Sequence, residues 1–177
     1  MLLKEALETK RRRGSAILAT NFYNAETLLA VLRAARETDS ALILQTSPAT
    51  ISYLGVETAV AMARAAAGEV GVSAWLHLDH ARDVDLVRRC IEAGYDSVMI
   101  DASEKEFDTN VRLTREVVAL ARPRGVLVEA ELGYVPKLGE REAQEYEMTL
   151  PEQAERFVQE TGVDLLAVAI GNAHGFY

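Results

Sequence analysis

Short runs of apolar residues alternate with longer segments in which apolar residues recur every three or four positions. The short runs are typical of buried strands, and the longer segments are typical of amphipathic helices. The expected strands are 15–22, 41–46, 73–78, 96–100, 126–128 with its continuation through 129–133, and 165–170. The expected helices are 1–13, one capped by Asn24, 57–67, one capped by Asp83, 105–121, and one opened by Pro151.

The connections between these elements contain residues that favour turns and helix ends. Ser47 and Pro48 predict a turn after the second strand. Gly68 and Gly94 predict the ends of two helices, and the polar segment 134–149 is expected to be a loop.

Apolar strands that alternate with helices indicate a parallel sheet covered by helices. A (β/α)8 barrel of the TIM type and an open doubly wound sheet both have this pattern, but the glycine-rich motif of the second is absent after the first strand. Polar residues stand at the carboxyl ends of all six strands: Asn21, Ser47, Asp79, His80, Asp101, Glu131 and His174. Because strand ends converge on one mouth in a barrel, we favour the barrel over the open sheet and expect a single domain, residues 1–177.

Composition narrows the possible partners and compartments. The formal net charge is −8, which argues against a surface for nucleic acid or anionic membranes, and the only basic run is 10–13. No apolar stretch approaches the roughly 20 residues of a membrane helix, and the N-terminus lacks a signal-peptide core. Cys90 is the only cysteine, so we expect a buried thiol in a cytoplasmic protein.

Two of the three histidines lie in the segment His77-Leu78-Asp79-His80. Strand alternation places His77 and Asp79 on one face, and His80 lies where the chain bends into the mouth. Neutral imidazole suits zinc, cobalt or iron, which makes His80 a candidate metal ligand. Asp79 beside it is a candidate general acid/base or a buried aspartate bonded to backbone amides. His77 is expected to take a direct or a supporting role.

The remaining candidates are distributed over the other strand ends. His174 lies between small residues, where Gly175 allows a ligand to approach the backbone. Asp101 and Glu131 are candidates for a second cation, or for a buried network with Lys or Arg. Neutral polar groups that suit a phosphate or sugar hydroxyls, or else ordinary turn and capping chemistry, are Ser47, Asn21 and Asn24.

The same residues favour one reaction type over others. No serine or cysteine lies in a G-x-S-x-G motif, which argues against nucleophilic catalysis. All lysines lie in helix or loop contexts, which argues against a Schiff base: Lys4, Lys10, Lys105 and Lys137. Metal-assisted proton chemistry remains, and aldol cleavage needs a Lewis acid that stabilises an enediolate when no imine forms.

The chain resembles the class II, metal-dependent ketose-bisphosphate aldolases, in particular the branch of fructose- and tagatose-bisphosphate aldolases. The resemblance runs in order along the whole chain. The motifs that carry it are 21–24 (NFYN), 45–48 (QTSP), 77–80 (HLDH), 97–103 (SVMIDAS), 128–133 (VEAELG) and 166–175 (LAVAIGNAHG).

The resemblance implies a TIM barrel with a catalytic zinc ion, and reversible cleavage of a ketose 1,6-bisphosphate to glycerone phosphate and glyceraldehyde 3-phosphate. It implies that Asp79 is the proton donor to the oxygen of the leaving aldehyde. The implied ligands are His80 and His174 for zinc, and Asp101 and Glu131 for a second cation or a mobile zinc. It also implies a homodimer or homotetramer.

The resemblance further implies that Gly175 and Ser47 lie near the two phosphates of the substrate. The acidic proton-transfer loop of the family is altered here, where Glu140 or Glu142 is the candidate replacement. The third zinc histidine of the family belongs to strand seven, beyond Tyr177, so we expect an incomplete TIM barrel with about the first six βα units. The alternative is a non-catalytic remnant that binds metal or sugar phosphate.

Overall fold

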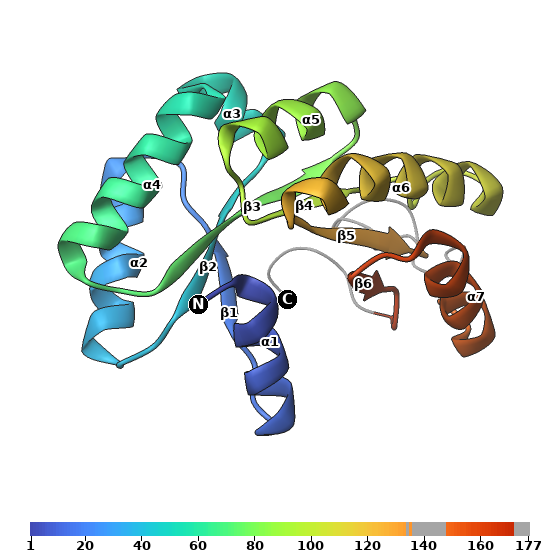
Figure 1. Cartoon of the computed structure of the whole chain (residues 1–177), viewed down its shortest axis with the longest axis horizontal. Helices are drawn as coiled ribbons and strands as arrows, with labels where there is room; N and C mark the ends of the chain where they lie inside the picture. The colour runs from blue at the N-terminus through green and yellow to red at the C-terminus, as the bar shows by residue number, and fades with distance from the viewer. Residues whose placement is uncertain (134, 136–147, 172–177) are drawn as a thin grey trace.

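The computed structural model of the chain describes residues 1–133, 135, 148–171, and it contains a six-stranded parallel sheet. The strands are β1 (Leu18–Asn21), β2 (Leu42–Thr46), β3 (Ala74–Ala81), β4 (Ser97–Ile100), β5 (Leu127–Leu132) and β6 (Leu165–Val168). Their spatial order is their chain order, and each pairs in parallel with the next. A doubly wound sheet reverses its strand order, so the consecutive order and the curl of the sheet confirm the expected partial barrel (Figure 1).

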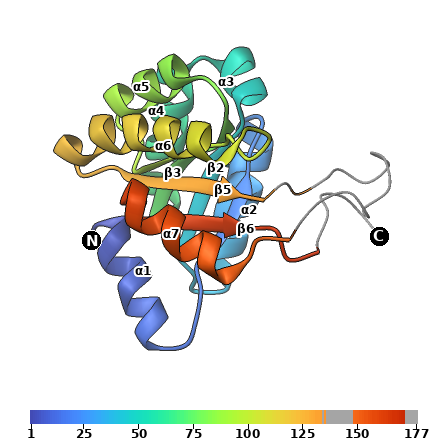
Figure 2. The same cartoon turned by 90° about the vertical axis from the view of Figure 1, so that its right-hand side faces the viewer.

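Helices cover the convex side of this curved sheet, and one further helix lies near the ends where the strands begin (Figures 1 and 2). The outer helices are α2 (Ala25–Glu37), α3 (Pro48–Leu54), α4 (Val56–Val70), α5 (Val84–Ala93), α6 (Phe107–Ala121) and α7 (Pro151–Thr161). A short 3-10 helix, Arg122–Arg124, follows α6, and α1 is Leu3–Arg12. Across the described ranges, every helix falls short of the length and apolarity needed to cross a membrane.

Two apolar clusters hold the sheet between these helices. The larger cluster lies between the convex face and the outer helices, and it includes Leu76 and Val98 from the strands and Leu28 and Phe157 from the helices. The smaller cluster lies on the concave face, where Leu3 and Ala6 of α1 pack against strand residues. Those strand residues are Ile43, Trp75 and Leu127. The concave face is therefore apolar near the start of the strands.

Two local predictions were wrong. The expected turn at Ser47 and Pro48 is the start of α3, because the Ser47 hydroxyl accepts a hydrogen bond from the amide of Thr50 and Pro48 is the first helical residue. The expected helix end at Gly68 lies inside α4, which continues to Val70 and ends at Gly71 in the left-handed conformation. An exposed glycine costs a helix only about 1 kcal/mol, so neighbouring residues carry α4 past it.

The concave face becomes polar toward the carboxyl ends of the strands. The strand register pairs Asn21 with Gln45, Gln45 with His77, and His77 with Ser97. Paired residues of parallel neighbours share a face, so these side chains form one polar row across four strands. Asp79 lies two residues beyond His77 on the same strand, one level closer to the mouth.

Candidate active site

A bulge at the end of β3 turns two consecutive side chains into the site. The pairing of β3 with β4 shifts register between Leu78 and Ala81, so β3 has one residue more than β4 over this stretch. His80 adopts a left-handed backbone conformation with φ 49°. Such a conformation costs a histidine about 1–3 kcal/mol, and it redirects a side chain that a regular strand would turn away from Asp79. This local geometry brings Asp79 and His80 to the same mouth.

His80 forms a compact group with two carboxylates from the neighbouring strand ends. Its Nδ1 hydrogen-bonds Oδ2 of Asp101 at 3.0 Å and lies 3.7 Å from Oε2 of Glu131. One ligand atom from each of the three residues lies within 4.8 Å of the other two. Imidazole nitrogen with carboxylate oxygens is a donor set that suits zinc and related divalent ions. The chemistry of these donors therefore fits a metal ion.

The titration of this group follows from its hydrogen bonds and burial. Burial by itself would raise the pKa of Asp101, but hydrogen bonds from His80 and from the hydroxyl and amide of Ser103 lower that pKa to about 2. The hydrogen bond to Asp101 raises the pKa of His80. Burial raises the pKa of Glu131, whose side chain is only 4% exposed. The group thus keeps Asp101 ionised and gathers negative charge around one imidazole.

Asp79 is held by two amide groups from the first two strands. Asn21 Nδ2 donates to Oδ2 of Asp79 at 3.0 Å, and Gln45 Nε2 donates to Oδ1 at 3.3 Å. Its Oδ1 also lies 4.0 Å from Nε2 of His80. The sequence left open whether Asp79 would be bonded to backbone amides. Side-chain amides hold it instead, and they fix the carboxylate beside the imidazole.

A second, deeper layer lies below Asp79 on the concave face. Nδ1 of His77 is 2.8 Å from the Ser97 hydroxyl, and its Nε2 is 3.6 Å from Oε2 of Glu129. Burial lowers the pKa of His77 to about 4, and burial followed by the charge of Asp79 raises the pKa of Glu129 to about 7. His77 Nε2 has no hydrogen-bond partner within the described residues, and an unsatisfied buried group of this kind costs about 1–3 kcal/mol.

The end of β5 is fixed from outside the barrel by a buried amide. Asn110 of α6 is 1% exposed, and its Nδ2 donates to the backbone oxygen of Glu131 at 2.8 Å. The hydroxyl of Thr114 donates to Oδ1 of Asn110 at 3.3 Å, which sets the orientation of the amide. This contact anchors the backbone from which the Glu131 carboxylate projects.

The other residues that the sequence singled out have different surroundings. Asn24 caps α2 by accepting a hydrogen bond from the amide of Thr27, and the Ser47 hydroxyl caps α3. Both polar groups are therefore engaged in capping, and a role in substrate binding stays a prediction. Four predicted site residues lie outside the described residues: Glu140, Glu142, His174 and Gly175.

The nearest charged neighbours distinguish the alternatives for the strand-end carboxylates. Among the described residues, Asp101 and Glu131 lie 3.0 Å and 3.7 Å from Nδ1 of His80, and Glu129 lies 3.6 Å from Nε2 of His77. The network with Lys or Arg that was the alternative for Asp101 and Glu131 is not found within the described part of the chain. Carboxylates gathered in this way favour a cation as their further partner.

The structure also brings in polar residues to which the sequence gave no individual role. They are Gln45, Ser97, Ser103, Asn110 and Glu129. Strand alternation was a sufficient signal for Glu129, which lies two residues before Glu131, whereas Gln45 shares a face with Asn21 through the pairing of β1 with β2. The contact between Asn110 and β5 depends on helix packing and has no comparable signal in the sequence.

Comparison with known proteins finds a matching family and named relatives. The family model for class-II fructose-bisphosphate aldolase matches residues 1–177. Fructose-bisphosphate aldolase from Giardia intestinalis is 39% identical over 176 residues, which cover 99% of this chain and 54% of the relative. The D-tagatose-1,6-bisphosphate aldolase subunit GatY from Klebsiella oxytoca is 41% identical over 177 residues, which cover 98% of this chain and 62% of the relative.

A solved structure shows the same arrangement of elements. The crystal structure of the YdjI aldolase from Escherichia coli K12 has a TM-score of 0.86 and 36% sequence identity, and the match covers 98% of this chain and 64% of that one. The chain therefore spans about half to two thirds of the length of these relatives. The family match along the whole sequence and the shared fold agree, and the chain belongs to the class-II fructose-bisphosphate aldolase family.

Proposed function

We propose that the protein is an aldolase that reversibly cleaves a ketose 1,6-bisphosphate, of the fructose or tagatose type, to glycerone phosphate and glyceraldehyde 3-phosphate. The observation that carries this proposal is the position of Asp79 beside the group of His80, Asp101 and Glu131 at the mouth of the partial barrel. The relatives named fructose- and tagatose-bisphosphate aldolases support the substrate class.

Members of this family depend on a metal ion, and zinc is the ion that we propose. His80 and His174 are the proposed ligands, and Asp101 and Glu131 are proposed to hold a second cation or an alternative position of the zinc. The donor chemistry of the three described residues fits this assignment. When bound, the ion supplies Lewis-acid stabilisation of the negative charge that develops on the ketone half of the substrate.

Asp79 is the proposed proton-transfer residue. In the cleavage direction its carboxylate takes the proton of the hydroxyl that becomes the aldehyde oxygen, and in the condensation direction the carboxylic acid returns it. The amide donors of Asn21 and Gln45 hold the carboxylate in one orientation for this exchange. Because the carboxylate is already oriented, less conformational entropy is lost when it meets the substrate.

The remaining roles concern the ends of the substrate and the assembly. Gly175 and Ser47 are proposed to contact the two phosphates, Asn24 is proposed to lie near them, and Glu140 or Glu142 is proposed to exchange the carbon-bound proton. We propose a cytoplasmic protein that forms a homodimer or homotetramer. Light scattering of the purified full-length protein would measure the oligomeric state.

The proposal is tested with the full-length protein in a cleavage assay coupled to the detection of glycerone phosphate. We expect cleavage that a chelator abolishes and that added zinc restores. Asp79→Asn keeps the size of the side chain but removes the base, so it should lower kcat by roughly 100-fold or more while the bound zinc is retained.

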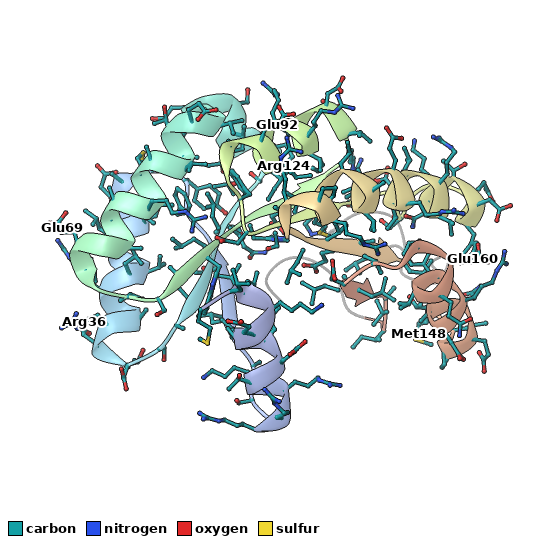
Figure 3. All side chains as sticks on the ribbon, viewed as in Figure 1. Arg36, Glu69, Glu92, Arg124, Met148 and Glu160 are labelled. Carbon is teal, nitrogen blue, oxygen red and sulfur yellow. The ribbon has the colours of Figure 1, made fainter. Side chains whose placement is uncertain are left out.

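Glu69→Gln is the matched control, because Glu69 lies exposed on the outer helix α4, away from the concave face (Figure 3). This variant should cleave at the wild-type rate. A wild-type protein that binds zinc but cleaves neither bisphosphate would instead indicate a non-catalytic binding protein.

A further inference from the structure

His77 is fixed on only one side, although it is one of the most buried polar residues of the concave face. The residue is 2% exposed, and its Nδ1 is 2.8 Å from the hydroxyl of Ser97, which is itself 1% exposed. The register pairs these two residues directly across β3 and β4. The imidazole therefore cannot turn without breaking a buried hydrogen bond.

The other ring nitrogen of His77 is directed at a carboxylate that no role described above uses. Nε2 lies 3.6 Å from Oε2 of Glu129, which is slightly beyond hydrogen-bond distance. It is the buried side-chain atom within the described residues that has no hydrogen-bond partner. Glu129 has the longer and more exposed side chain of the two, so a small rotation of the glutamate closes the gap.

Glu129 lies close enough to the proposed catalytic and metal-binding residues for its carboxylate to disturb their contacts. It lies two residues before Glu131 on the same face of β5, one level below the group of His80, Asp101 and Glu131. Released from His77, it can compete with Asp79 for the amide donors or with Asp101 for His80. A hydrogen-bond donor that holds Glu129 in place therefore preserves the contacts of Asp79 and those of His80.

We propose that His77 is a positioning residue that holds Glu129. Nδ1 accepts a hydrogen bond from the hydroxyl of Ser97, and the Nε2–H group donates to the carboxylate of Glu129. The imidazole is then the neutral tautomer protonated at Nε2. The expected effect on kcat rests on the proposed function. The expected tautomer rests on the contacts of His77 alone.

Two near-isosteric variants of the full-length protein separate positioning from packing. In His77→Asn the amide ends near the position of Nδ1 and keeps the contact with Ser97, whereas in His77→Gln the longer side chain reaches the position of Nε2. We expect His77→Asn to lower kcat and zinc affinity by roughly 10- to 100-fold, as is typical when a partner of the groups around a metal is lost, with little change in KM. His77→Gln should recover most of both quantities.

Two further measurements do not depend on turnover. Chelator competition gives the zinc affinity of each variant, and nitrogen NMR of histidine-labelled protein reports the tautomer of His77. The effect of His77→Asn should also vanish when Glu129→Gln is already present, because the two residues act as a pair.

The proposal would be overturned if His77→Asn and His77→Gln lowered kcat and zinc affinity equally, and in proportion to their loss of thermal stability. A tautomer protonated at Nδ1, or additive effects of His77→Asn and Glu129→Gln, would also overturn it. If the wild-type protein binds zinc without cleaving substrate, the proposed function fails, and the NMR and zinc-affinity results still decide the role of His77.

Discussion

Gly133 occupies a position where an added side chain would collide with residues that join the ends of β5 and β6. It follows β5 directly, with φ +77°, and lies two residues after Glu131. A Cβ atom there would approach Oγ1 of Thr149 to 2.5 Å and Cβ of Ala169 to 2.9 Å. Thr149 joins the ends of two strands, because its hydroxyl donates to the carbonyl oxygen of Leu132 and accepts from the amide of Ala169. Gly133→Ala should therefore disturb the junction between β5 and β6.

The magnitude has two parts. The left-handed conformation costs an alanine about 1–2 kcal/mol relative to glycine. Overlap with packed neighbours costs about 1–3 kcal/mol more, because Thr149 must give up or lengthen its bonds to both strand ends. The free energy of unfolding should fall by about 2–5 kcal/mol, a large share of the 5–15 kcal/mol typical of a folded protein.

Gly125→Ala is the matched control for the backbone contribution. Gly125 also has a positive φ of +67°, but a Cβ atom there meets nothing within 4 Å. Urea unfolding of the full-length protein should show a loss of about 1–2 kcal/mol for Gly125→Ala, and zinc affinity should change only in Gly133→Ala.

Equal destabilisation by the two alanines would refute the steric part of this reasoning. Unchanged zinc affinity in a measurably destabilised Gly133→Ala would refute the link between this junction and the position of Glu131.

Three further predictions concern the core and the ionisable groups. Phe157→Ala should lower the free energy of unfolding by about 3–5 kcal/mol, because Phe157 is fully buried, whereas Tyr53→Ala at an exposed site should change it by less than about 0.5 kcal/mol. Burial raises the pKa of the Cys90 thiol to about 12, so iodoacetamide should modify it only after denaturation, and rapid reaction of the native protein would contradict this. The pKa of Asp101 is lowered to about 2, so at neutral pH its ionised carboxylate accepts the hydrogen bonds of Ser103, and these bonds stabilise the fold. The destabilisation by Ser103→Ala should then shrink as the pH falls toward 2, and a constant value in pH-dependent urea unfolding would exclude the link.

The site illustrates the limits of local patterns. Alternation along β3 correctly placed His77 and Asp79 on one face, because a strand has a fixed period of two. It could not place His80, since a bulge depends on the register that β3 adopts against β4. The turn predicted at Ser47 was wrong for a similar reason, because the Ser47 hydroxyl and the following proline begin a helix there.

The sequence by itself determined the alternation of strands and helices, the parallel sheet and the polar strand ends, because each is a property of local periodicity and of residues close in the chain. The family was visible in the same motifs. Only the tertiary structure decided which amides hold Asp79, which carboxylates surround His80, and which glutamate faces His77. These contacts join residues tens of positions apart, and their distances are set by strand register, helix packing and one strained backbone angle, none of which a single segment specifies.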